Sequence, residues 1–333
     1  MYDVICIGSA TQDVFVSSDQ TCLISVRTCD NEETYLAYEY GAKVAVDHLF
    51  ITTGGGAANT AISFARLGLR TGIICEVGED DAGRMIEGAL RAEDVDTTMM
   101  TRNPDLTTGY SVILTGPTGD RTVLVHRGAA TGLTRPEVDW ESAAQTTWLY
   151  LSSLAGESAS LWDDLATFAC EHGLRLAINP GGQQIKRGLD GLRGILSVTD
   201  LLFLNQREAY QLLDLEEKRG EDDEREALSR LVAAGCKCAI MTRGAEGAMA
   251  FDGTDYHLVP APPVPVVSNL GAGDAFASGC LAALCHGLPL ANALKVATLN
   301  SGSVVGYMGA TKGLLTWETV EAQLRQRPGD PDQ

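Results

Sequence analysis

The chain has no surplus of basic residues. Its 333 residues include 25 Lys and Arg against 44 Asp and Glu, which gives a formal net charge of −19. Nucleic acids and anionic membrane surfaces favour proteins that present a basic face, so we expect neither as a partner. A nucleotide is still allowed, because backbone dipoles and Mg²⁺ can hold phosphates on an acidic protein.

Long apolar runs and an N-terminal targeting segment are also missing. No stretch reaches the roughly 18 apolar residues that a membrane-spanning helix needs, and residues 1–3 lead directly into a strand pattern at 4–7. We therefore expect a cytoplasmic protein. A chain of this length, with 45% hydrophobic residues, can bury the core of one large α/β domain with an appendage, or of two domains.

Clusters of metal ligands are missing as well. The nine cysteines and five histidines are scattered, and Cys236-Lys237-Cys238 has the wrong spacing for a zinc pair. Most cysteines lie in apolar segments, for example Cys6, Cys75, Cys170 and Cys280, which predicts buried, reduced thiols. We expect no transition-metal site.

Strand and helix patterns alternate from residue 140 onward. Short, continuously apolar strands are expected at 148–151, 174–178, 201–204 and 238–242. With helical patterns between them, such strands predict a mainly parallel central sheet covered by helices on both faces. Ligands bind to such sheets at the carboxyl ends of the strands.

Candidate polar groups occur at these strand ends. Each is expected to lie just past a predicted strand: Asp13, Asn205, Thr242 and a glycine turn at 271–273. Two further segments, 14–52 and 108–127, are extended instead of alternating, and the second predicts a β-hairpin with its turn at 116–120.

The most informative segment is Gly271-Ala272-Gly273-Asp274, which follows a strand-like valine run at 264–267 and opens a helix of small residues. Two glycines flanking an alanine let successive backbone N–H groups point toward one anion, and the helix dipole reinforces them. A carboxylate at that place is useful if it accepts the proton of a hydroxyl that attacks phosphorus. An ordinary helix N-cap is the alternative for Asp274.

A second glycine turn lies far upstream, at Gly54-Gly55-Gly56, and also opens a helix. Its glycines let the backbone approach a ligand closely. Asn59 falls in the first helical turn, where its amide can donate to and accept from a polyol. The alternative is a flexible turn followed by a solvated helix residue.

The ordered set of motifs resembles that of the ribokinase-like carbohydrate kinases, also called the phosphofructokinase-B family. The motifs run in the family's order from residue 8 to about residue 313: Gly-Gly-x-x-x-Asn-x-Ala at 54–61, Leu67-Gly68, Val-Gly-x-Asp-x-x-Gly at 77–83, Asn-x-x-Glu at 205–208, Thr-x-Gly-x-x-Gly at 242–247, Gly-Ala-Gly-Asp at 271–274 and Gly309-Ala310.

The resemblance implies transfer of a phosphoryl group from ATP, with Mg²⁺, to a sugar hydroxyl. Asp274 would accept the hydroxyl proton, and the N–H groups of Gly271, Ala272 and Gly273 would neutralise the transferring phosphoryl. The sugar would be bound by Asp13, Gly55, Gly56, Asn59 and Arg127. The nucleotide would be bound by Asn205, Glu208, Thr242, Arg243, Gly244, Gly247 and Thr298.

Glu208 would orient Mg²⁺ through water. A helix N-cap at Asn205, with Glu208 as its capping-box partner, is the alternative for this pair. For Arg127, the alternative is a surface charge at the end of a hairpin.

The resemblance also implies how the chain is divided. An α/β domain would comprise residues 1–13, 53–107 and 128–326. Residues 14–52 and 108–127 would form a small β-sheet lid over the substrate, and residues 327–333 would form a tail. The first lid segment is long, and two interpretations are open: a larger lid, or a lid that also forms a homodimer.

Three departures from the family limit what it implies. Ser268 stands where relatives carry an aspartate that helps to hold a monovalent cation, so we expect little activation by K⁺. Thr11 and Gly56 stand where ribokinases carry Asn and Lys. Ribose is therefore not favoured over fructose, a keto-deoxy sugar acid or a nucleoside.

Two other classes of protein are alternatives. A dinucleotide-dependent oxidoreductase would need Gly-x-Gly-x-x-Gly after the first strand, and residues 8–13 lack it. A non-catalytic sugar-binding regulator would typically have lost the carboxylate of Asp274, which is present.

Overall fold

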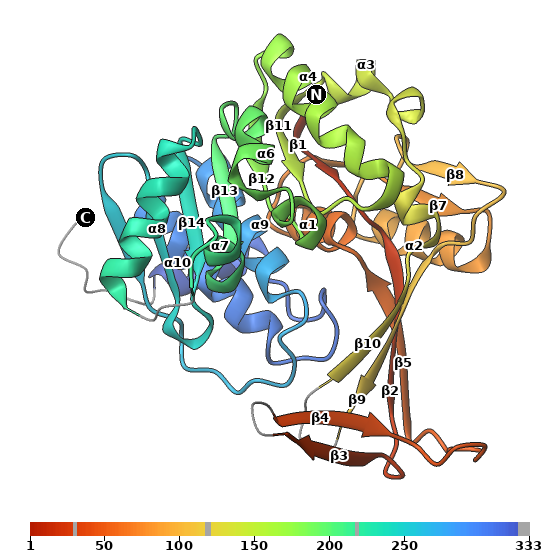
Figure 1. Ribbon diagram of the computed structural model, residues 1–333. Helices are drawn as coiled ribbons and strands as arrows, with labels where there is room; N and C mark the ends of the chain where they lie inside the picture. The colour runs from red at the N-terminus through yellow and green to blue at the C-terminus, as the bar shows by residue number, and fades with distance from the viewer. Residues whose placement is uncertain (29–31, 117–120, 217–219, 326–333) are drawn as a thin grey trace.

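The computed structural model describes residues 1–28, 32–116, 121–216 and 220–325. Its centre is an eight-stranded sheet in the order β16-β15-β14-β13-β12-β11-β1-β6 (Figure 1). These strands are β1 (Tyr2–Ile7), β6 (Thr71–Ile74), β11 (Thr146–Leu151), β12 (Arg175–Ile178), β13 (Leu201–Asn205), β14 (Cys238–Thr242), β15 (Ala248–Phe251) and β16 (Tyr256–Val259). All neighbouring pairs from β6 to β14 are parallel, and β15 and β16 add an antiparallel edge. The mainly parallel sheet predicted from the sequence is confirmed.

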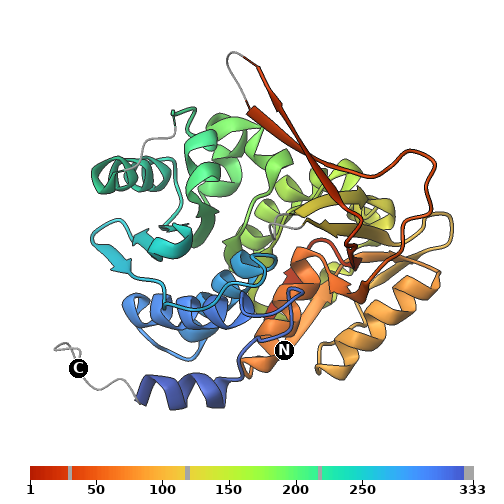
Figure 2. The same cartoon turned by 90° about the horizontal axis from the view of Figure 1, so that it is seen from below.

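Helices cover both faces of this sheet, because the side chains of each strand alternate between them. In β1, Val4 and Cys6 face one core and Ile5 and Ile7 the other. The first core is covered by α1 (Gly56–Arg66), α2 (Asp81–Ala92), α9 (Ala272–Cys285), α10 (Leu290–Val304) and α11 (Trp317–Arg325). The second is covered by α3 (Trp140–Ala143), α4 (Leu161–His172), α5 (Gly182–Ile185), α6 (Gly188–Leu196), α7 (Gln206–Leu212) and α8 (Glu221–Ala233). Figure 2 shows these two layers from below.

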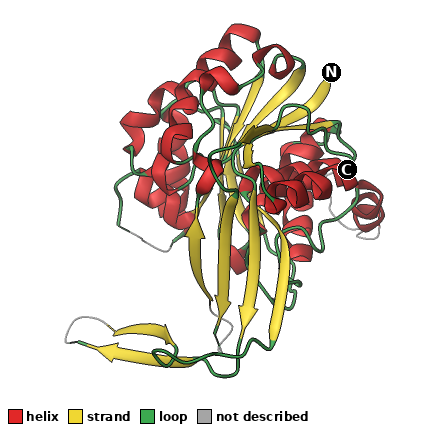
Figure 3. Cartoon of the chain, turned by 90° about the vertical axis from the view of Figure 1, so that its right-hand side faces the viewer, coloured by secondary structure: helices red, strands yellow, loops and turns green. Residues whose placement is uncertain are grey.

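A separate four-stranded sheet, the lid sheet, extends away from this body (Figure 3). It has the order β10-β9-β2-β5 and consists of β2 (Thr11–Ser17), β5 (His48–Gly54), β9 (Gly109–Thr115) and β10 (Arg121–His126). The predicted hairpin is therefore present as β9 and β10, although its turn at 117–120 lies outside the described residues. Two short pairs complete the strands: β3 (Cys22–Arg27) with β4 (Glu32–Ala37), and β7 (Glu76–Gly78) with β8 (Thr101–Asn103).

The hairpin of β3 and β4 projects beyond the lid sheet and exposes apolar side chains, among them Leu23, Ile24, Val26 and Tyr35. The division into domains and the homodimer through the lid stay predictions. The predicted tail at 327–333 lies outside the described residues. No helix in the described part of the chain is long and apolar enough to cross a membrane.

Three expectations from the sequence are wrong. The valine run at 264–267 is not a strand: Val266 and Val267 are exposed in a loop, because Pro260, Pro262, Pro263 and Pro265 cannot donate to a strand ladder. The first strand ends at Ile7, and Asp13 lies inside β2 instead of at the end of β1. Cys170 is exposed on α4, not buried.

The motif at 77–83 connects the N-terminus of α2 to the start of β9 in the lid sheet through hydrogen bonds of Asp80. Asp80 is the N-cap of α2, and its Oδ1 accepts from the N–H of Gly83 (2.8 Å) and from Oγ1 of Thr108 (2.6 Å). Its Oδ2 accepts from the N–H of Thr108 (2.8 Å), which directly precedes β9. Burial alone would raise the pKa of Asp80, but these hydrogen bonds hold it below its usual range.

We expect Asp80→Ala to lower the free energy of unfolding by about 1–2 kcal/mol, because it removes a helix cap and leaves partly buried donors unpaired. Urea denaturation measures this loss. The neighbouring Asp81, whose side chain is fully exposed, is the matched control, and Asp81→Ala should leave the midpoint unchanged. Equal losses for the two variants would contradict the capping role.

Candidate active site

The N-terminus of α9 is built on a backbone that only glycine adopts easily. Gly271, the N-cap, has φ +77°, and a Cβ on it would lie 2.4 Å from Cβ of Ala310. The loop that carries Gly309 and Ala310 therefore packs directly on this turn. No side chain caps the helix, so Asp274 is not the N-cap that was the alternative. The N–H of Ala272 makes a long contact of 3.3 Å with the carbonyl of Asn269.

Asp274 lies in the first turn of α9 and meets α1 instead. Nδ2 of Asn59 donates to its Oδ2 at 2.8 Å. Burial raises the pKa of Asp274 to about 6; the Asn59 hydrogen bond opposes this rise, and the nearby charge of Asp13 adds to it. A carboxyl with that pKa is ionised near neutral pH and still basic enough to take up a proton, which suits a general base.

A small polar cavity of about 280 Å³ lies in front of Asp274, between the lid sheet and the body. It brings together all of the residues that the sequence predicts for the sugar, with two from the glycine turn: Asp13, Gly55, Gly56, Asn59, Arg127, Gly271 and Asp274. Arg127 directly follows β10 and is exposed at the rim. Residues from distant parts of the chain thus converge on one site.

Gly54 and Gly55 leave space around the carboxyl group of Asp13 and the backbone next to it. A Cβ on Gly54 would lie 2.0 Å from Oδ2 of Asp13, and one on Gly55, at φ +92°, would lie 2.5 Å from the carbonyl oxygen of Ser9. Asp13 is buried, which raises its pKa, while hydrogen bonds from Ser111 and Thr11 oppose the rise. Two carboxyl groups, Asp13 and Asp274, therefore face the same small cavity.

Beyond the N-terminus of α9 lies a second, larger cavity of about 920 Å³. Among its lining are these predicted residues: Asn205, Thr242, Arg243, Gly244, Gly247, Ala272, Gly273 and Thr298. Asn205 and Thr242 are the last residues of the adjacent strands β13 and β14, so they do lie at the carboxyl edge of the sheet. The turn at 271–274 therefore separates the two cavities: Gly271 and Asp274 line the small one, Ala272 and Gly273 the large one.

Glu208 is not among the residues that line the large cavity. It forms a capping box with Asn205: the N–H of Glu208 donates to Oδ1 of Asn205 (2.8 Å), and Oε2 of Glu208 accepts from the N–H of Asn205 (2.9 Å). The alternative interpretation of this pair is thus present in the structure, and burial raises the pKa of Glu208. The capping bond uses Oε2 of Glu208.

Three further predicted residues have internal partners. Nε of Arg243 lies 2.9 Å from Oε2 of the buried Glu224 on α8, and its Nη2 lies 2.7 Å from Glu246, so this guanidinium is held by two carboxylates. Oγ1 of Thr298 donates to the carbonyl of Lys295. Ser268 is buried, and its Oγ accepts from the N–H of Leu270 at 3.2 Å.

Sequence reasoning missed several lining residues. Ser9, Ser111 and Ser153 line the small cavity, and Pro262 and Phe276 line the large one. Isolated serines carry no motif, so nothing in their sequence context marks them. Glu224 stands among the acidic residues of the first turn of α8, where charged side chains are usually solvated, yet it is buried against Arg243.

Comparison with known proteins defines the class. Residues 6–317 match the pfkB family carbohydrate kinases. The protein is thus a phosphotransferase with an alcohol group as acceptor. The chain belongs to the pfkB family, as its motifs indicated.

Individual relatives differ in what they act on. The chain is 31% identical to the aminoimidazole riboside kinase of Salmonella typhimurium, in an alignment that covers 79% of this chain and 83% of that protein. It is also 31% identical to a fructokinase of Klebsiella pneumoniae, in an alignment that covers 79% of this chain and 87% of that protein. The ribokinase of Arabidopsis thaliana, solved with ribose and ATP, has the same fold, with a TM-score of 0.82, 20% identity and coverage of 97% of this chain and 99% of that one.

Proposed function

We propose that this protein transfers the γ-phosphoryl group of ATP to a hydroxyl of a sugar or of a sugar-containing molecule such as a nucleoside. One observation carries the proposal: the N-terminus of α9 forms the wall between a large cavity lined by the nucleotide motifs and a small polar cavity that contains two carboxyl groups. Phosphoryl transfer needs this arrangement, because an acceptor and a nucleotide must meet at a group of anion-stabilising donors.

Asp274 is proposed as the base. It lies on the acceptor side of the turn, and its raised pKa fits proton uptake from an attacking hydroxyl. Asn59 holds one of its oxygens, and Oδ1 of Asn59 is buried without a hydrogen-bond partner among the described residues. A buried acceptor of this kind is suited to a substrate hydroxyl, which would donate to it.

The donors at the turn are proposed to stabilise the charge of the phosphoryl group. Ala272 and Gly273 lie at the positive end of the helix dipole and line the large cavity, which supports a role for their N–H groups there. We propose that Asn205, Thr242, Arg243, Gly244, Gly247 and Thr298 bind the nucleotide. The acceptor would be held by Asp13, Gly55, Gly56, Asn59 and Arg127.

Mg²⁺ fits this site only as a partner of the nucleotide. Among the described residues there is no group of three carboxylate, histidine or cysteine side chains that could hold a metal ion. Mg²⁺ in such sites binds through one or two carboxylates, waters and substrate phosphates, where it neutralises phosphate charge. Oε1 of Glu208 could hold a water of that shell. Ser268 offers a neutral hydroxyl that is already engaged, so we propose that K⁺ activates the enzyme little.

A coupled assay of ADP release over a panel of sugars, sugar phosphates and nucleosides tests the proposal. At least one acceptor should raise ADP release well above the rate without acceptor. ADP release that no acceptor changes would contradict it.

The pH profile of kcat/KM tests the base. We expect an acid limb near pH 6 in which activity falls about tenfold per pH unit, because the free enzyme must have Asp274 ionised. In Asp13→Asn the limb should move to lower pH, because the charge of Asp13 contributes to the raised pKa of Asp274. A limb that stays in place in Asp13→Asn would show that another group titrates.

A further inference from the structure

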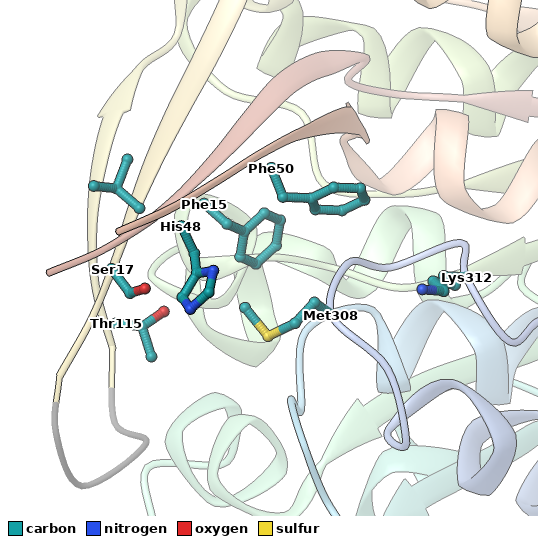
Figure 4. A pocket seen from close by; sticks show the side chains of 8 residues that line it. Phe15, Ser17, His48, Phe50, Thr115, Met308 and Lys312 are labelled. Carbon is teal, nitrogen blue, oxygen red and sulfur yellow. The ribbon is translucent and has the colours of Figure 1, made fainter. Parts of the chain in front are cut away.

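A third cavity lies beside the acceptor site and differs from it in chemistry. It has a volume of about 290 Å³ and lies between the lid sheet and the loop that follows α10 (Figure 4). The lid supplies Phe15, Ser17, His48, Phe50 and Thr115. Met308 and Lys312 of the loop face them from the body. None of the predicted site residues lies in this cavity.

The register of the lid sheet places this cavity and the acceptor site on the same face. Residues two apart along a strand point to the same side, and directly paired residues do so as well. Asp13, which lines the acceptor site, is followed on that face by Phe15 and Ser17. Phe15 pairs with Phe50, and Ser17 with His48. The step from Asp13 to Phe15 is about 6.6 Å along the strand, roughly the width of one ring.

Across from the lid sheet, the loop at residues 308–312 also passes from the acceptor site to the third cavity. Ala310 packs on Gly271 of the acceptor site, and the next residue back, Gly309, faces the lid: a Cβ on it would lie 3.4 Å from the Phe50 ring and 3.6 Å from Thr52. Met308 and Lys312 then reach the third cavity. One short loop thus borders both the acceptor site and the third cavity, so the two cavities are neighbours along the lid.

The lining indicates what the third cavity binds. Phe15 and Phe50 pack with their ring centroids 5.9 Å apart, and the thioether of Met308 lies opposite, as Figure 4 shows. Aromatic rings and a thioether favour a flat apolar ring. Around them stand groups that can donate hydrogen bonds: the hydroxyls of Ser17 and Thr115, the imidazole of His48 and the ammonium of Lys312.

Charge narrows the choice of ligand. The lining contains no carboxylate in the described part of the chain, although the protein as a whole is strongly acidic. A cationic ring is therefore disfavoured, and a ring with nitrogen or oxygen acceptors at its edge is favoured. A free sugar would fill the polar acceptor site and leave the third cavity unused.

We infer that the acceptor is a glycoside with a planar heteroaromatic aglycone, whose sugar lies at Asp13 and Asp274 and whose ring lies against the exposed ring of Phe50, with the buried Phe15 packed behind it. This inference rests on the proposed function and specifies its acceptor. The aglycone contributes binding by stacking and by burial of its faces. The sugar alone presents the hydroxyl to the base.

Kinetics with matched acceptors test the inference. We would measure kcat/KM for D-ribose, methyl β-D-ribofuranoside, inosine, adenosine and 5-aminoimidazole riboside. At least one heteroaromatic riboside should exceed ribose and the methyl riboside by about a hundredfold, the scale of a stacked base. Equal or higher values for the free sugar or the methyl riboside would overturn the inference.

A pair of neighbouring variants localises the effect. Phe50 and Ile51 are both exposed, at 41% and 45%, but point to opposite faces of β5. Phe50→Ala should lower kcat/KM for the preferred heteroaromatic riboside at least about tenfold and leave the methyl riboside within threefold. Ile51→Ala should change neither. A loss in Phe50→Ala that is equal for both acceptors would overturn the inference, because it would reflect lid structure alone.

A binding measurement separates this inference from the proposed function. Calorimetry with the three heteroaromatic ribosides, without nucleotide, reports the third cavity directly. Binding that Phe50→Ala weakens, without turnover of any acceptor, would support the cavity and contradict phosphoryl transfer. Turnover of free sugars without binding of any of these ribosides would support phosphoryl transfer and contradict the cavity. A cavity filled by a second copy of the chain would also abolish riboside binding and overturn the inference.

Discussion

Asp274→Asn should lower kcat by at least about 10²-fold, the usual scale for loss of a general base. An amide at this place cannot take up the hydroxyl proton, while the turn at Gly271–Gly273 and the large cavity are left intact. We therefore expect the Kd for ATP to stay within a few-fold of the wild-type value. Steady-state kinetics with the preferred acceptor, together with calorimetric titration of ATP, measure the two quantities.

Thermal stability provides the control for this variant. Burial raises the pKa of Asp274 to about 6, above the ordinary carboxyl pKa of about 3.9, so the folded state favours the protonated form. The stabilisation from this shift is present below the ordinary pKa and is lost as pH rises through about 6. Asp274→Asn removes the charge, so at pH 8 it should melt at or above the wild-type temperature. A variant that keeps near-normal kcat would contradict the assignment of the base.

Gly271→Ala should produce the second large effect, a loss of at least about 10²-fold in kcat accompanied by a lower melting temperature. The backbone at φ +77° is strained for alanine, and the added Cβ would lie 2.6 Å from Cα of Ala310, which is backbone that cannot move aside alone. The turn must therefore shift, and the N–H groups of Ala272 and Gly273 shift with it. Loss of aligned donors of this kind typically costs 10²–10³ in rate.

Gly273→Ala is the matched control for folding. A Cβ on Gly273 would meet no atom within 4 Å, and its φ is not in the left-handed region, so this variant should melt like the wild type. Differential scanning calorimetry and single-turnover kinetics below the melting temperature distinguish misfolding from loss of the donors. Gly271→Ala with wild-type melting and kcat within threefold would show that the turn needs no glycine.

The sequence was most informative where the site requires a backbone conformation that favours glycine. Gly271 and Gly55 are needed for positive φ and for close approach, and the motifs that contain them include Asp274 and Asn59, which line one cavity. The continuously apolar strands, with helical patterns between them, likewise predicted the parallel sheet, because strands of a parallel sheet are buried on both faces.

Prediction was poorer where long-range packing decides. The valines at 264–267 have strand propensity, but the interspersed prolines prevent pairing. Asp13 follows the first strand closely, yet the chain turns at Gly8–Ala10 and enters the lid before reaching it. Which face of the lid carries Phe15 and Phe50 depends on the register between β2 and β5, which no local pattern specifies.

The pair Asn205 and Glu208 shows a different limit. A capping box and a nucleotide motif need the same residue types at the same spacing, so the sequence could not choose between them. The structure contains the capping box, with Asn205 also lining the large cavity. The capping box is therefore present, while the nucleotide-binding role of Asn205 and the role of Glu208 at Mg²⁺ stay proposals.

The most direct test of the central claim is ³¹P NMR of the reaction with equimolar ATP and the preferred acceptor. We predict that the γ-phosphate signal of ATP disappears while a phosphomonoester signal of the acceptor and the signals of ADP grow in equal amounts, and that Asp274→Asn slows this conversion at least about 10²-fold. Release of inorganic phosphate alone, an unchanged spectrum with every acceptor, or equal rates for wild type and Asp274→Asn would contradict the account.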